Sequence, residues 1–436
     1  MLAYFYWYDY STSLHITVGG EDSLTHHPPG IESFSYLNEE WHRRELLDMI
    51  EAGVDFLLPV YWGDRVNMAW AVPGLEKLVS AEFGLIQDGM DPPRIGMFFD
   101  TTALMMEHRY TGQPGDRPNL STEYGFDLFY SMISAFYSAV PAELWARVDG
   151  GAIVWLYSSG WALDYDQSLV EHARERFGEE FNCSLYLVKE RSWDVEADME
   201  YGWGAALGPV IRDVAAIGPG FDNEGAVRCY GQSPLARERT GGYGYRDDWE
   251  MALRSGKNIV VIEIWNELHE GTEICETVEL GREYIELTAN YSAIFKSGSW
   301  NRILEEMGSM VSFTTGRIEG VPGGTCDLEI NFTNNGWRSW PEVIDLSLFW
   351  LALEGGDRFG EIYRVEFPGR LTTGPHVETL RIDMPGTEGY YRVLVSMGDL
   401  SRRTELEAVV PEVWPPLALI LLMVAAGNLG WRESFD

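Results

Sequence analysis

The sequence lacks the short motifs that indicate metal, nucleotide or serine-hydrolase chemistry. Its 436 residues contain no HExxH motif, no CxxC pair, no G-x-S-x-G elbow, no phosphate loop and no dinucleotide fingerprint. The four cysteines, Cys183, Cys229, Cys275 and Cys326, are spread far apart and indicate neither a zinc site nor a disulfide framework. We therefore expect no catalytic metal and no cofactor.

Basic residues are also scarce. The 32 Lys and Arg residues stand against 68 Asp and Glu residues, which gives a formal net charge of −36 at pH 7. This excess repels nucleic-acid phosphates and anionic lipids, so we expect a neutral ligand and no nucleic-acid partner. Aromatic residues make up 13% of the chain. They either stack on the apolar faces of sugar rings or fill the cores of barrels and sandwiches, and composition leaves both interpretations open.

Apolar strands alternate with helical segments through residues 1–299. This alternation predicts parallel strands, and we expect a (β/α)8 TIM barrel. The expected strands are residues 2–10, 54–62, 94–100, 152–157, 185–190, the segments GWGAALG and VAAIGPGF between 202 and 221, and the stretch that begins at Lys257. The expected helices are residues 39–52, capped by Asn38, and 75–83, 124–138, 168–177 and 277–295.

The pattern of apolar residues and turns changes after residue 299. Short alternating runs with Gly and Pro turns follow from Val311 to Arg402, and we expect an all-β Ig-like sandwich over residues 300–410. Residues 411–436 form an apolar tail, in which Trp414–Trp431 is either a short membrane anchor or a terminal element packed on the sandwich.

No basic, apolar leader precedes the first expected strand, so the chain is either cytosolic or has lost a leader. We expect an extracellular or cell-surface protein, held at the membrane if the tail is an anchor, with a cytoplasmic location as the alternative. The sequence does not predict an oligomeric state.

The strongest chemical signal lies at the end of the last expected barrel strand. Val261 and Glu263 alternate with apolar residues, and the strand runs into a turn that carries Glu267 and Glu270 beside Asn266 and His269. Carboxylates three residues apart in a turn approach within about 5–6 Å, a distance at which two carboxyls can act on one glycosidic bond. The alternative is that both are solvated surface carboxylates.

Glu263 is a separate case, because the strand pattern places it deeper inside the barrel. A buried charge needs compensation. Lys189 and Arg191 lie on one face of a neighbouring expected strand, and we expect one of them to pair with Glu263 as a structural partner.

Further candidate ligand-binding residues lie at or near expected strand ends. Asp100 either binds sugar hydroxyls or caps the following turn. The other candidates, each with core packing or a structural role as its alternative, are Tyr8, His27, Trp62, Trp155, Tyr157, Arg191 and Trp193.

The segment W-N-E-L-H-E-G-T, residues 265–272, resembles the N-E-W-H-E-G-T signature of glycoside hydrolase family 99, the endo-α-1,2-mannosidase and mannanase family. The resemblance includes YFYWY, AGVDFLLPVYWG, PPRIGMFFDT and PGFD, and so covers most of the first 299 residues. It implies that Glu267 draws the proton from a sugar 2-hydroxyl, that Glu270 serves as acid and base, and that a 1,2-anhydro sugar gives retention. Leu268 stands where the signature has Trp, so one sugar contact differs.

Taken together, these features predict a retaining glycoside hydrolase that acts on an α-linked polysaccharide or glycan. The alternatives are a non-catalytic carbohydrate-binding or surface-structural protein and a glycan-synthesis enzyme of the same fold, since one barrel hosts many chemistries.

Overall fold

The computed structural model divides the chain into two compact units, Met1–Gly298 and Ser299–Asp436. It describes residues 1–63 and 70–298 of the first unit. In the second unit it describes residues 309–313, 318–319, 321–334, 343–352, 358–366, 374–387, 389–397 and 404–410.

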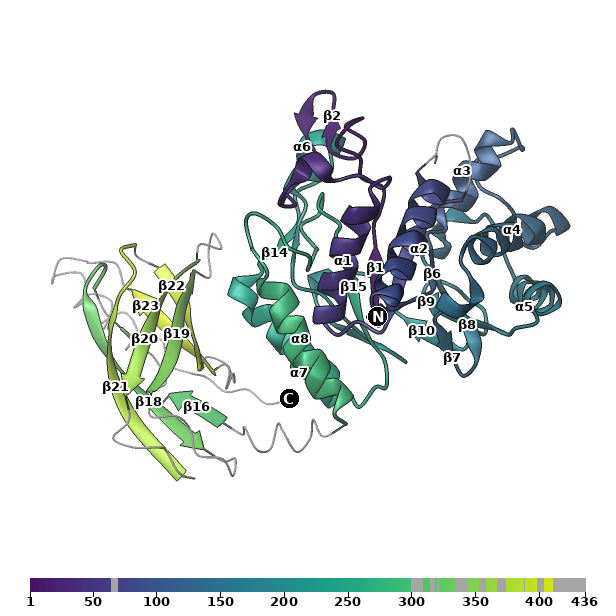
Figure 1. Cartoon of the computed structure of the whole chain (residues 1–436). Coiled ribbons are helices and arrows are strands. Elements are labelled where there is room, and N and C mark those ends of the chain that lie inside the picture. The colour runs from purple at the N-terminus through teal and green to yellow at the C-terminus, as the bar shows by residue number, and fades with distance from the viewer. Residues whose placement is uncertain are drawn as a thin grey trace, which may run out of the picture. The chain divides into compact units, whose positions relative to one another are not determined.

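The first unit is built on one large, mainly parallel sheet (Figure 1). Its strands lie in the order β10-β9-β8-β6-β4-β1-β15-β12-β11, and only β11 on this path runs antiparallel to its neighbour. These strands are β1 (Leu2–Tyr4), β4 (Phe56–Tyr61), β6 (Met97–Phe99), β8 (Gly151–Leu156), β9 (Leu185–Glu190), β10 (Met199–Tyr201), β11 (Val210–Ile211), β12 (Ala215–Ile217) and β15 (Val260–Ile264). Short strands β5 (Arg94–Ile95) and β7 (Arg147–Val148) pair with β4 and β8.

Helices cover the outside of this sheet. They are α1 (Glu39–Glu51), α2 (Ala71–Gln87), α3 (Thr102–Tyr110), α4 (Glu123–Ala139), α5 (Gln167–Phe181), α6 (Glu224–Tyr230), α7 (Tyr243–Arg254) and α8 (Glu283–Lys296). The contacts α5–α4, α4–α2, α2–α1, α1–α8 and α8–α7 link most of them into a series that follows the curvature of the sheet.

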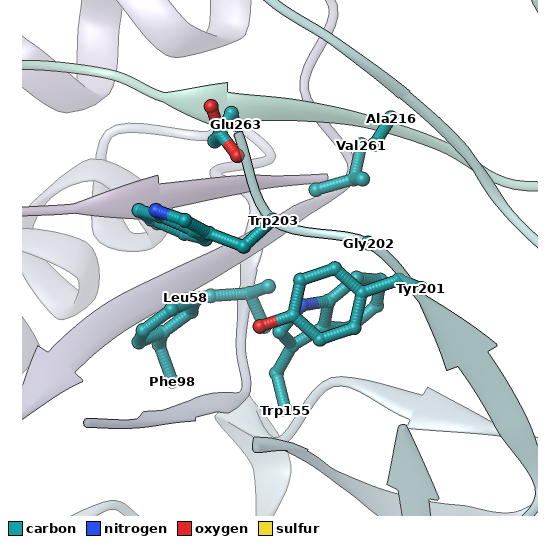
Figure 2. A pocket seen from close by; sticks show the side chains of 10 residues that line it. Leu58, Phe98, Trp155, Tyr201, Gly202, Trp203, Ala216, Val261 and Glu263 are labelled. Carbon is teal, nitrogen blue, oxygen red and sulfur yellow. The ribbon is translucent and has the colours of Figure 1, made fainter. Parts of the chain in front are cut away.

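The sheet curves into a nearly closed barrel whose interior is packed with side chains. One small cavity is lined from strands on all sides, by Ala3, Leu58, Phe98, Trp155, Tyr201, Ala216, Val261 and Glu263 (Figure 2). The space that the centre of a water molecule can occupy in it is about 10 Å³, which is enough for about one water. Between β10 and β12 no ladder is recorded among the described residues, but the N–H of Asp213 donates to the carbonyl of Glu200 at 3.1 Å.

Local sequence signals account for several element boundaries. The Asn38 side chain accepts the N–H of Glu40 and begins α1, as predicted, and β9 has its predicted limits. The prediction of a strand at GWGAALG is wrong, because Ala205–Leu207 form a 3-10 turn. Gly204 (φ 96°) and Gly208 (φ 154°) explain the difference, since left-handed backbone interrupts a strand.

Other elements also differ from expectation. The first strand covers only Leu2–Tyr4, the last helix begins at Glu283 rather than at residue 277, and the helices α3, α6 and α7 were not predicted. The aromatic residues after Tyr4 belong instead to an extended segment that runs toward the site at the end of β15.

The described residues of the second unit form two β-sheets. One has the order β16-β18-β21, and the other has the order β17-β23-β22-β19-β20. Their strands are β16 (Ser309–Phe313), β17 (Ile318–Glu319), β18 (Thr325–Asn334), β19 (Val343–Ala352), β20 (Arg358–Glu366), β21 (Gly374–Asp383), β22 (Gly389–Met397) and β23 (Thr404–Val410). Both sheets contribute buried side chains, namely Leu328, Ile330 and Ile382 from one and Leu348, Trp350 and Val393 from the other.

The apolar tail Trp414–Trp431 lies outside the described residues. Among the helices that the structure describes, none has the length and apolar character needed to cross a membrane.

Candidate active site

The turn that follows β15 is fixed to the segment after β1. Asn266 pairs with the backbone of Phe5, accepting its N–H at 2.8 Å and donating to its carbonyl at 2.8 Å. The Tyr8 hydroxyl donates to the Asn266 carbonyl at 3.1 Å and accepts the N–H of Leu268 at 3.0 Å. Both side chains therefore hold the backbone on either side of Glu267, in the position where a barrel carries its functional groups.

Glu267 and His269 form a buried pair within this turn. The Oε1 atom of Glu267 lies 2.5 Å from Nδ1 of His269 and accepts the His269 backbone N–H at 3.1 Å. Nε2 of His269 lies 3.0 Å from the carbonyl oxygen of His15. A carbonyl only accepts, so Nε2 carries a hydrogen, and a second hydrogen lies between Nδ1 and Oε1 of Glu267.

The electrostatics of the pair agree with this assignment. Burial lowers the pKa of His269, but the Glu267 carboxylate, the His15 carbonyl and Glu270 together outweigh burial, and the net pKa is raised. His15 behaves oppositely: burial, and then the charge of His269, lowers its pKa to about 3, so it is neutral. Tyr8 stacks on the His269 ring, with centroids 5.4 Å apart.

Glu270 lies beside this pair in a different environment. Its carboxyl is half-buried and accepts no hydrogen bond from any residue within the described ranges. Burial, and next the charge of Glu267, raises the pKa of Glu270 to about 7, against a smaller opposing effect of His269. Glu270 thus keeps its proton to higher pH than an ordinary glutamate does, while Glu267 beside it is paired with His269.

An aromatic wall lies at the same end of the barrel as the two carboxyls. Tyr157 contacts the indole of Trp203 at a centroid distance of 5.1 Å, and Trp203 contacts Phe98 at 5.4 Å. Tyr157 directly follows β8, Trp203 follows β10 and Glu270 follows β15, so all three lie at the carboxyl-terminal ends of parallel strands in one sheet. Burial, followed by the charges of Asp100, Glu270 and other carboxylates, raises the pKa of Tyr157.

Trp62 and Asp100 form a second part of this wall. Trp62 donates from Nε1 to Oδ2 of Asp100 at 2.8 Å, while Oδ1 accepts the N–H of Thr102 at 3.0 Å. The carboxylate therefore caps the first turn of α3, which is one of the two roles expected for it. Trp7 connects this pair to the turn, since its ring lies 5.9 Å from Trp62 and 6.2 Å from His269.

Sequence reasoning missed several residues of the site. Trp203 and Tyr230 were not predicted, and neither was the contact of His15 with His269. Tyr230, on α6, is about half-exposed, and its ring lies edge-on to His269 at 5.9 Å. Both are aromatic residues beside a glycine, a frequent combination in loops, and no sequence pattern distinguishes them from other loop aromatics.

The partner predicted for Glu263 is wrong. Lys189 pairs with Glu200 at 3.3 Å, and Arg191 lies 3.5 Å from Glu190. The Glu263 carboxylate instead accepts backbone N–H groups from the turn that follows β10. Backbone donors compensate its charge, so no cation is required.

The other predicted ligand-binding residues have partners of their own or are packed in the core. Trp155 is 1% exposed and packs on Tyr201 inside the barrel, and Trp193, also 1% exposed, donates to the Tyr157 carbonyl. The His27 ring is held between Asp22 and Glu279. Arg191 lies next to Glu190, as described above. Among the described residues no group of three His, Cys, Asp or Glu side chains is placed to hold a metal ion.

Comparison with known proteins gives a family and a set of similar folds. No curated protein matches the sequence. The GH99 endo-alpha-mannosidase from Bacteroides thetaiotaomicron has a similar structure over 68% of this chain and 97% of its own, with 15% sequence identity and a TM-score of 0.47. A glycoside hydrolase-like protein is similar over 66% of this chain and 93% of its own, with 13% identity and a TM-score of 0.46. Residues 4–299 match the model of the family described as Domain of unknown function (DUF5010), and the chain belongs to that family.

Proposed function

We propose that the first unit is a retaining glycoside hydrolase that cleaves an α-linked polysaccharide or glycan at Glu267 and Glu270. The observation that carries the proposal is the pair of neighbouring carboxyls in unlike environments at the end of β15. Glu267 is paired with His269, whereas burial and the Glu267 charge raise the pKa of Glu270 to about 7. A carboxyl that keeps its proton near neutral pH, beside a second carboxyl paired with a histidine, fits acid and base catalysis at a glycosidic bond.

The surroundings of the pair fit a neutral sugar. Trp62, Tyr157 and Trp203 present ring surfaces near the carboxyls, and such surfaces pack on the apolar faces of pyranose rings. Among the described residues, no Arg or Lys side chain stacks on the rings of Trp62, Tyr157 or Trp203. An uncharged glycan suits the site better than an anionic ligand.

The first chemical step follows the resemblance to family 99. The second carboxylate oxygen of Glu267, Oε2, accepts no hydrogen bond from a described residue and would take the proton of the sugar 2-hydroxyl. The 2-oxygen then attacks the anomeric carbon as the bond to the leaving oxygen breaks, and Glu270 donates its proton to that oxygen. The product of this step is a 1,2-anhydro sugar.

Water completes the cycle. Glu270, now ionised, removes a proton from water, which opens the three-membered ring at the anomeric carbon. Glu267 returns its proton to the 2-oxygen, and both carboxyls regain their starting states. Two inversions at the anomeric carbon give net retention.

His269 keeps the total charge of the site constant through these steps. Its imidazolium pairs with ionised Glu267 at the start, and its charge also acts on Glu270. When the proton passes to Glu267 and another leaves Glu270, the negative charge moves from one carboxyl to the other beside the same cation. The low-dielectric site therefore never holds an uncompensated charge.

The test is a screen of α-linked oligosaccharides with product analysis, using the wild type, Glu270→Gln and Glu267→Gln. We expect the wild type to cleave at least one glycan and both variants to lose activity by about 10²-fold or more. Glu175→Gln, an exposed carboxyl on α5, is the matched control and should keep full activity. A glycan that binds to the wild type without being cleaved would support the non-catalytic alternative.

We infer that the second unit is an Ig-like sandwich. Its two sheets, largely antiparallel, and the buried side chains that both contribute support this assignment. The tail Trp414–Trp431 is proposed as a membrane anchor, because Trp residues stand at both ends of its apolar run. A chain that ends at Val410 should then lose membrane partitioning in flotation assays while keeping glycan cleavage, and unfolding of that chain would contradict the anchor.

A further inference from the structure

Glu263 is a buried carboxylate that binds backbone rather than a cation. It accepts the N–H groups of Gly204, Ala205 at 2.9 Å and Ala206 at 2.7 Å. Burial raises the pKa of Glu263 to about 7, while the three backbone donors favour the ionised form. These donors open the 3-10 turn Ala205–Leu207, where backbone N–H groups otherwise have no partner.

The segment that Glu263 holds spans the interval between β10 and β12. It is also packed closely at two glycines. A Cβ on Gly202 would lie 2.6 Å from a methyl group of Val210, and a Cβ on Gly218 would lie 2.7 Å from the Cα of Ala206. The backbone of residues 202–206 is therefore packed closely against β11 and the end of β12. On its other side, facing the barrel interior, Glu263 holds it by hydrogen bonds.

Trp203 lies within this fixed segment, directly before the three donors. Its indole is half-buried and packs on Phe98 and Tyr157, which limits its rotation. Figure 2 shows the indole between Glu263 and Phe98 on one side of the small interior cavity. Because Tyr157, Trp203 and Glu270 follow β8, β10 and β15, which are parallel strands of one sheet, Trp203 lies at the same end of the barrel as the proposed active site.

We propose that Trp203 is a specificity-determining residue that stacks on a pyranose ring of the bound glycan, and that Glu263 is its positioning residue through the backbone of residues 204–206. The inference rests on the proposed function for the identity of the ligand, a neutral α-linked glycan. A rigid indole that is packed on one side and open on the other loses little conformational entropy when a sugar binds. Three backbone hydrogen bonds to one buried carboxylate supply that rigidity without placing a charge at the sugar-binding surface.

Glycan binding can be measured apart from catalysis in a variant that is expected to be inactive. Glycan dissociation constants are measured by calorimetry in Glu270→Gln protein with the α-linked oligosaccharide panel. Trp203→Ala should weaken binding by about 5- to 10-fold, and Trp203→Phe, which keeps a ring, should recover most of the loss. Glu263→Gln replaces one acceptor oxygen with an amide that faces a backbone N–H, and it should weaken binding by about 3- to 10-fold.

Two further variants test the route from Glu263 to Trp203. Gly204→Ala strains the backbone at φ 96° without touching either side chain, and it should weaken glycan binding as Glu263→Gln does. In protein that already carries Trp203→Ala, Glu263→Gln should add less than about twofold, because both changes act on one contact. Glu82→Gln is the control, since Glu82 is fully buried on α2 and should leave affinity unchanged.

The outcomes are distinct. Unchanged affinity in Trp203→Ala, or no binding of any glycan in the panel, overturns the role of Trp203. If the fold-changes in the dissociation constant caused by Glu263→Gln and Trp203→Ala multiply in the double variant, the positioning role of Glu263 is overturned. If glycans bind and the variants behave as expected, but the wild type cleaves none of them, the hydrolase proposal fails while this inference stands.

Discussion

The ring of His269 connects Glu267 to a carbonyl that lies 254 residues earlier in the chain. Nδ1 is 2.5 Å from Oε1 of Glu267, and Nε2 is 3.0 Å from the carbonyl oxygen of His15. The carbonyl fixes the hydrogen on Nε2, and the carboxylate receives the other. This relationship determines which oxygen of Glu267 faces a substrate, because Oε1 is already occupied by two donors.

Replacing His269 should change the pH dependence as well as the rate. His269→Gln removes the cation that acts on both carboxyls, and kcat should fall by about 10²- to 10⁴-fold. Since the positive charge of His269 lowers the pKa of Glu270, its loss raises that pKa and should move the alkaline limb of the kcat/KM profile to higher pH. His172→Gln, on α5, is the control. If the alkaline limb stays at the same pH in His269→Gln, the charge of His269 does not affect the pKa of Glu270.

Glu45 provides a test of buried charge outside the site. It lies on α1, accepts the indole N–H of Trp265 at 2.5 Å, and burial raises its pKa from 4.5 to about 7. Between these values the folded state binds more protons than the unfolded state, so the contribution of Glu45 to stability falls as pH rises.

Glu45→Gln keeps an acceptor for Trp265 and removes this titration. As pH rises from about 4.5 to about 7.5, the wild type loses stability through this titration and the variant does not. The free energy of unfolding of the variant should therefore increase by on the order of 3 kcal/mol relative to that of the wild type across this range. Urea denaturation across that range measures the difference, with Glu175→Gln as control. A stability difference that does not vary with pH would show that Glu45 stays ionised.

His27 should act on stability rather than on ligand binding. Its ring nitrogens lie 2.8 Å from Asp22 and 2.7 Å from Glu279. Burial lowers the pKa of His27, but the two carboxylates raise it above 6.5 overall. The stabilisation is present below the unfolded pKa and is lost as pH rises through the folded one.

We therefore expect His27→Gln to lower the melting temperature at pH 5.5 and to have a smaller effect at pH 8.5. Glycan affinity should not change, because Glu279 and Asp22 already occupy both ring nitrogens. Weaker glycan binding by His27→Gln with unaltered melting at both pH values would return His27 to the ligand-binding residues.

The part of the fold that follows from side-chain periodicity could be predicted from sequence. Val261 and Glu263 line the barrel cavity as the alternation along β15 predicted. The same alternation fails for Trp265, because β15 ends at Ile264 and the indole turns to Glu45 in the helical layer. Periodicity holds only while a strand continues, and nothing in the residues after Ile264 marks its end.

The partners of the site residues were less predictable. The alternation along β15 predicts that Glu263 is charged and buried, and such a residue suggests a cation as its partner. Its actual partners are backbone N–H groups, which any residue except proline can supply, so the sequence does not identify them. Likewise the contact of His269 with His15 uses a carbonyl, which every residue has. His15 reaches it with a left-handed backbone, φ 56°, that histidine adopts infrequently.

If Glu267 and Glu270 cleave an α-linked glycan with retention, the anomeric configuration of the first product will show it. Proton NMR of the anomeric signals should be followed within the first minutes of reaction, before mutarotation, for the wild type and for Glu270→Gln. We expect that the α-anomer appears first with wild type, that activity peaks on the acid side of neutrality because Glu270 must be protonated to donate, and that Glu270→Gln forms no product. An initial β-anomer, or product formation by Glu270→Gln at the wild-type rate, would contradict this proposal.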